Sequence, residues 1–91
     1  MYYTVSYDIT DNKRRRHINK ILLDYGQRVQ YSVFEMDISE KLASEMKDRL
    51  AAEIDSGTDS IRIYPLCNRC KERVLILGAG ELKQQEELFV F

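Results

Sequence analysis

Two stretches with the apolar spacing of an amphipathic helix alternate with β-rich stretches along this chain, and that order limits the folds available to it. The first helical stretch begins near residues 11 and 12, and Gly26 is expected to end it in the left-handed conformation. The second begins behind Ser39, a preferred helix-capping residue. Each has one apolar face to bury: Ile18, Ile21, Leu22 and Tyr25 in the first, and Leu42, Met46, Leu50 and Ile54 in the second.

The β-rich stretches are residues 2–7, 27–38, 60–64 and 73–77. The second of them is long for one strand, and a bend at Tyr31 and Ser32 would divide it into two short antiparallel strands. Pro65 should stop the third, because proline cannot donate to a sheet ladder. The resulting order is β-α-β-β-α-β, with additional β-like segments towards the C-terminus.

This order predicts an α+β fold of the ferredoxin-like type, in which two helices cover one face of a four-stranded antiparallel sheet. Residues 1–78 would form this domain, and residues 79–91 a C-terminal extension. The extension ends in the apolar run at 88–91, which should either pack on this domain or add an edge strand to a partner. A chain of 91 residues has a small core, so a symmetric dimer is expected to bury further surface.

Asp8 is the first candidate functional residue. Strand alternation places it on the face opposite Tyr3, Val5 and Tyr7, at the carboxyl end of an apolar strand. A polar turn and a basic cluster follow it at the start of the first helix, and we predict that this cluster, with Arg14, Arg15 and Arg16, binds nucleic acid. Successive helical residues point about 100° apart, so only one or two of these arginines can face one polyanion and the others are expected to be solvated or paired. One carboxylate beside a cluster of cations suits a metal-assisted phosphodiester site, although a solvated strand end followed by a charged helix would have the same sequence.

Composition limits the classes of function. The net charge is −1, which excludes a generally basic nucleic-acid binder, so any contact with a polyanion must come from the local basic cluster. No apolar run approaches the roughly 20 residues of a membrane span, and the N-terminus has no basic leader, so we expect a cytoplasmic protein without membrane contact.

The only two cysteines form a CxxC motif, Cys67 to Cys70. One such motif supplies half of a typical four-ligand zinc site. Pro65 and Leu66 before it favour a tight turn, whereas a redox-active pair would follow a strand and open a helix. We therefore expect reduced structural thiols, with a metal shared across a dimer as the alternative.

Four segments together are similar to a known family: YDI at 7–9, YGQRVQYSVFE at 25–35, RIYPL at 62–66 and VLILG at 74–78. In these motifs and in their order, the chain resembles the small CRISPR-associated endoribonuclease family. This is the smaller of the two proteins that acquire new spacers in CRISPR immunity. The resemblance implies a ferredoxin-like homodimer that works in CRISPR adaptation with a larger integrase subunit.

The resemblance also implies roles for individual residues. Asp8 would face its dimer mate and, with it, hold a divalent metal such as magnesium. Tyr7 and Phe34 would belong to the catalytic site, although a phenylalanine in such a strand is more often a core residue. Arg15 of the first helix and Arg28 of the RVQ motif would contact nucleic acid, and His17 takes a further position that is often arginine in the family.

Two functions from different classes follow. The first is a magnesium-dependent endonuclease that cleaves RNA or duplex DNA, in which arginines steady the phosphate. The alternative is a non-catalytic dimeric scaffold that holds DNA through its phosphates for the larger integrase subunit. A small-molecule regulatory domain of the same fold has less support, because no glycine-rich ligand loop is present.

Overall fold

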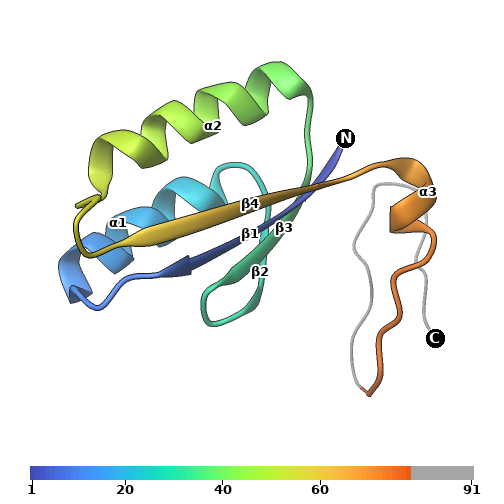
Figure 1. Ribbon diagram of the computed structural model, residues 1–91, viewed down its shortest axis with the longest axis horizontal. Helices are drawn as coiled ribbons and strands as arrows, with labels where there is room; N and C mark the ends of the chain where they lie inside the picture. Colours follow the sequence, from blue (N-terminus) through green and yellow to red (C-terminus); the bar gives the residue numbers. More distant parts are fainter. Residues whose placement is uncertain (79–91) are drawn as a thin grey trace.

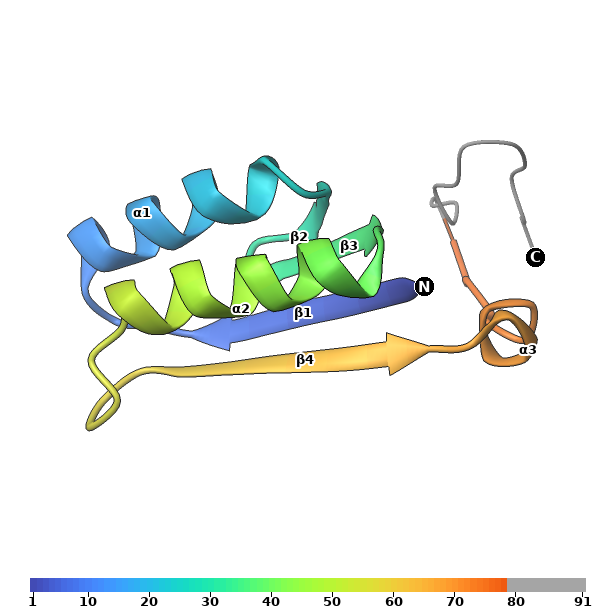
Figure 2. The same cartoon turned by 90° about the horizontal axis from the view of Figure 1, so that it is seen from above.

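A computed structural model describes residues 1–78 and contains one antiparallel sheet covered on one face by two helices (Figures 1 and 2). The strands lie in the order β2-β3-β1-β4, which is the ferredoxin-like arrangement expected from the sequence. In chain order, the elements are β1 (Tyr2–Asp8), α1 (Asn12–Leu23), β2 (Gln27–Gln30), β3 (Val33–Asp37), α2 (Glu40–Glu53), β4 (Ser60–Leu66) and the short α3 (Asn68–Lys71).

The strand β1 is the centre of the fold. It pairs with β3 along one edge and with β4 along the other, both antiparallel. Its alternation is confirmed, because the side chains of Tyr3, Val5 and Tyr7 are buried against the helices, where they meet Phe34 and Leu22. Burial of each large apolar side chain contributes about 1.5–3 kcal/mol. The strand is therefore held by β3 as far as Ser6 and by β4 along its whole length, where Asp8 is in register with Ser60.

Both helix starts are capped as the sequence predicts. The Asp11 carboxylate accepts a hydrogen bond from the Arg14 backbone N–H at 2.8 Å, and the Ser39 hydroxyl accepts one from the Leu42 N–H at 3.1 Å. The Leu42 side chain itself is largely exposed, so the buried face of α2 consists of Met46 and Leu50 with partly buried neighbours.

Gly26 has a different role from the one predicted. Its φ angle is not positive, so it is not a left-handed helix cap. Instead, the chain passes so close to β3 at this point that an added Cβ would overlap the carbonyl oxygen of Glu35 and the side chain of Met36. Glycine is required here for close approach and not for an unusual backbone angle.

Two predictions about the C-terminal half were wrong. The strand β4 continues through Pro65 to Leu66. Proline is tolerated because β4 is at the edge of the described sheet, where the missing N–H can face outward. Residues 73–77 form no strand; after α3 the chain runs without regular structure to Gly78. The predicted strand at 88–91 and the extension 79–91 lie outside the described residues.

Candidate functional site

Asp8 is the last residue of β1, and its side chain is exposed. Two hollows meet at it. The first, which we call the Asp8 hollow, has a volume of about 200 Å³ and is lined by Tyr7, Asp8, Ile9, Arg15, Asn19, Arg28, Tyr31 and Ser32. The second, about 250 Å³, lies towards the sheet face that the helices leave open and is lined by Ser6, Tyr7, Asp8, Ser60, Arg62 and Tyr64. The structure thus brings four predicted site residues, Tyr7, Asp8, Arg15 and Arg28, to one place.

Tyr7 joins three elements beneath this hollow. Its hydroxyl lies 2.6 Å from the Asn19 side-chain oxygen on α1 and 3.2 Å from the Tyr31 carbonyl oxygen in the β2–β3 turn. Its backbone N–H donates to the Ser32 carbonyl at 3.1 Å. Because the ring is buried and the hydroxyl is already partnered, Tyr7 holds the walls of the hollow together.

Arg15 fixes the loop that follows Asp8. Its Nη1 donates to the carbonyl of Ile9 at 3.1 Å and to that of Thr10 at 3.4 Å, and its Nη2 donates to the Asn12 side-chain oxygen. A guanidinium has five N–H donors, so Arg15 keeps donors for an anion in the hollow. Within residues 1–78, Asp8 forms no ion pair with Arg15 or Arg28.

Arg14 does not line the Asp8 hollow. Its Nε donates to Asp59 Oδ2 at 2.7 Å and its Nη2 to Oδ1 at 3.3 Å, which is a bidentate ion pair with a fully buried carboxylate. Asp59 also accepts from the Asp55 backbone N–H at 3.0 Å. The positive charge of Arg14 is therefore paired within the fold, and its contact with nucleic acid stays a prediction.

Removal of the Asp59 charge is expected to change the acid stability of the fold. The hydrogen bond from Arg14, followed by that from the Asp55 backbone, lowers the pKa of Asp59. A lowered folded pKa means that the pair stabilises the fold above the unfolded value of about 3.9 and that this contribution is lost as pH falls below it.

Asp59→Asn should therefore melt below the wild type at pH 7, and the gap should narrow as pH falls from about 4 to 2. Thermal melts over this pH range measure the gap, with Asp48→Asn on the exposed face of α2 as the control. A gap that stays constant with pH would contradict the ion-pair account.

The three remaining candidate residues, Arg16, His17 and Phe34, differ in how exposed their side chains are to solvent. Arg16 is exposed on α1. His17 Nδ1 lies 3.5 Å from Glu53 Oε2 on α2, so this side chain is directed towards the second helix. Phe34 is completely buried in the core, where its ring on β3 packs against β1. Its place in a catalytic site stays a prediction.

Three residues of the two hollows were missed in the sequence. Asn19 lies one helical turn after Arg15, and this spacing places both on one helix face. Arg62 pairs in register with Ser6 and, by alternation, faces the open side of the sheet. Tyr31 was interpreted only as a bend residue, and the structure places it, exposed, at the tip of the hairpin between β2 and β3.

The metal-ligating side chains are sparse in the part of the chain that the structure describes. No group of three or more His, Cys, Asp or Glu residues gathers there.

Cys67 and Cys70 are exposed free thiols, and Cys67 caps α3 directly after β4. The motif thus follows a strand and opens a helix, contrary to the turn expected from Pro65. The hydrogen bond from the Cys70 backbone lowers the pKa of the Cys67 thiol.

The fold and the site define a small ferredoxin-like protein with an exposed carboxylate and two arginines at the end of its central strand. The family model described as CRISPR associated protein Cas2 matches residues 1–74. The chain belongs to this family, as its sequence motifs indicated. Within residues 1–78, no helix has the length and apolar character that crossing a membrane requires.

Relatives and solved structures agree with this assignment. The CRISPR-associated endoribonuclease Cas2 4 of Rhodospirillum rubrum is 44% identical, covering 97% of this chain and 71% of the relative. The CRISPR-associated endonuclease Cas2 2 of Thermus thermophilus is 40% identical, covering 97% and 93%. The crystal structure of Streptococcus pyogenes Cas2 at pH 6.5 is 43% identical, with a TM-score of 0.76, and the match covers 86% of this chain and 100% of that one.

Proposed function

We propose that this protein acts in CRISPR adaptation as a metal-dependent endonuclease that hydrolyses phosphodiester bonds in RNA or DNA. The observation that carries the proposal is the exposed Asp8 carboxylate, held at the end of the central strand in one hollow with Arg15 and Arg28. The names of the Rhodospirillum and Thermus relatives, an endoribonuclease and an endonuclease, support the same chemistry.

The metal site of this proposal needs two copies of the chain. In one protomer, among residues 1–78, Asp8 is not joined by two further metal-ligating side chains. A symmetric dimer that brings two Asp8 carboxylates together would supply anionic oxygens, which with water suit magnesium. When bound, magnesium supplies an acidified water and a positive charge for a phosphoryl oxygen.

The residues of the chain itself hold the substrate. Arg28 is exposed on β2 and lines the Asp8 hollow, so its guanidinium is placed to donate to phosphate oxygens. Arg15 lines the same hollow, and Arg62 lines the second hollow at Asp8, on the open face of the sheet. Asn19 and Tyr7 keep these walls at a fixed separation.

A second function, a dimeric scaffold that holds DNA for a larger integrase subunit, is favoured by one observation. A single carboxylate per protomer is a sparse donor set for a catalytic metal among the described residues. In this function, the arginines bind phosphates without regard to sequence, and Asp8 has no chemical role.

A mixing experiment tests whether the site is shared. Wild type is equilibrated with about a ninefold excess of Asp8→Asn, and magnesium-dependent cleavage of RNA and of duplex DNA is measured. If both Asp8 carboxylates are needed, only about one wild-type protomer in ten has a wild-type mate, so activity per wild-type protomer should fall about tenfold. Unchanged activity per wild-type protomer would contradict a shared site, and wild type without magnesium-dependent cleavage would favour the scaffold.

A further inference from the structure

Tyr31 is an exposed aromatic residue that the proposed chemistry leaves without a role. It lies at the tip of the hairpin between β2 and β3, and 87% of its surface is open to solvent. Its backbone is nevertheless held in place, because its carbonyl oxygen lies 3.2 Å from the buried Tyr7 hydroxyl. An exposed ring on a fixed backbone is a suitable platform for another flat group.

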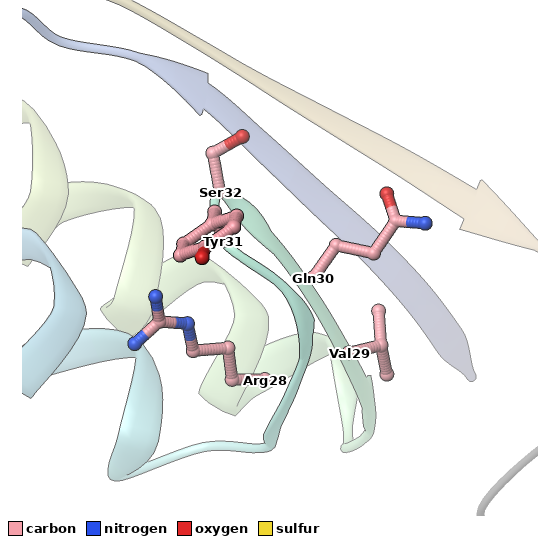
Figure 3. Close-up of a pocket in the computed structure, with 5 residues that line it drawn as sticks. All are labelled: Arg28, Val29, Gln30, Tyr31 and Ser32. Carbon is pink, nitrogen blue, oxygen red and sulfur yellow. The ribbon is translucent and has the colours of Figure 1, made fainter. Parts of the chain in front are cut away.

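Arg28 defines one side of this ring. The Arg28 guanidinium carbon lies 5.5 Å from the centroid of the Tyr31 ring, a cation–π contact. Figure 3 shows Arg28 and Tyr31 on one side of the hairpin, with Val29 and Gln30 directed to the other. The ring and the cation together form a pair that can contact a base and its phosphate at the same time.

The pair also connects two hollows. Arg28 and Tyr31 line the Asp8 hollow, and with Val29, Gln30 and Ser32 they line a wider hollow of about 710 Å³ along the hairpin (Figure 3). This wider hollow is shallow and open to solvent, so it suits an extended strand lying along the surface. A strand whose phosphate occupies the Asp8 hollow would have its next base beside Tyr31.

We propose that Tyr31 stacks on a base of an unpaired nucleic-acid strand whose neighbouring phosphate is held in the Asp8 hollow. This assignment rests on the proposed function and gives it a substrate class, single-stranded RNA or DNA or an unpaired end. Bases inside a duplex are already stacked on one another, so only an unpaired strand can offer a free base face to the ring.

The absence of tryptophan from the chain allows a direct test. Tyr31→Trp, made together with Asp8→Asn so that no substrate is cleaved, places a single indole at the hairpin tip. Its fluorescence is followed while a single-stranded oligonucleotide, or the duplex of the same sequence, is added at equal phosphate concentration. Leu42→Trp on the exposed part of α2 is the matched control, also with Asp8→Asn.

We expect quenching at Tyr31→Trp by the single strand only, with no change at Leu42→Trp. Tyr31→Ala should weaken single-strand binding by about 5- to 150-fold, and Tyr31→Phe should bind like wild type, because stacking needs only the ring. Equal quenching by the duplex, or unchanged binding by Tyr31→Ala, would overturn the inference. The inference would also be overturned if the fluorescence of Tyr31→Trp fell as the protein was concentrated without nucleic acid. Residue 31 would then lie in a contact between copies of this chain. None of these readouts depends on cleavage, so the inference and the proposed nuclease can fail separately.

Discussion

Asp8→Asn should lower magnesium-dependent cleavage by about 100-fold or more and leave the fold intact. The metal contributes several kcal/mol of charge stabilisation, and each 1.36 kcal/mol corresponds to a factor of ten in rate. The amide keeps the size of the carboxylate but loses the negative charge that attracts the metal. The side chain is exposed and carries no packing, so its replacement should not unfold the domain.

The measurement is initial cleavage rate with magnesium and with chelator, alongside the circular dichroism of each variant. Asp48→Asn is the control, because it removes one exposed carboxylate from α2 and leaves the site unchanged. Nucleic-acid binding should persist in Asp8→Asn, since Arg15 and Arg28 remain. A variant that cleaves as fast as the wild type would show that the nuclease centre does not include Asp8.

Gly26→Ala is expected to destabilise the fold strongly, and much more than Gly57→Ala. The new Cβ would overlap the Glu35 carbonyl oxygen, which is part of the β2–β3 backbone and cannot rotate away as a side chain can. Overpacking of this kind costs about 3 kcal/mol, which lowers the melting temperature of a domain of this size by about 12 °C or more.

Gly57→Ala is the matched control for Gly26→Ala. At Gly57 the nearest atom to an added Cβ is the flexible Asp55 carboxylate at 3.4 Å, and the φ angle is not positive. Its melting temperature should stay close to that of the wild type, or rise slightly because alanine restricts the unfolded chain. If Gly26→Ala melts no lower than Gly57→Ala, the close approach to β3 is not a constraint on the fold.

Much of the fold could be predicted because the local patterns and the tertiary fold agree. The alternation in β1 and the helical spacing in α1 and α2 are set by the face that each element buries, and the caps at Asp11 and Ser39 mark the helix starts. The apolar run at 73–77 failed as a strand because apolar composition alone does not provide a pairing edge. Gly26 was misread because close packing against another segment leaves no local signal.

The candidate site was predictable only in part, for a related reason. Asp8 and Arg28 are recognisable from their motifs, and the structure brings both to one hollow. The sequence did not show which of the three consecutive arginines would be paired within the fold. The buried Asp59, which lies 45 residues further along the chain, binds Arg14, whereas the nearby loop carbonyls bind Arg15 and Arg16 is left exposed. The long-range pair of Arg14 and Asp59 is visible only once the chain has folded.

The most direct test of a metal held by Asp8 is a pair of thermal melts, with and without magnesium, on wild type and Asp8→Asn. Two carboxylates facing each other in a dimer repel, so without metal Asp8→Asn should melt higher than the wild type. Magnesium should raise the melting temperature of the wild type by a few degrees through preferential binding to the folded dimer, and leave Asp8→Asn unchanged. Equal shifts in both proteins would contradict the assignment of Asp8 as the metal ligand.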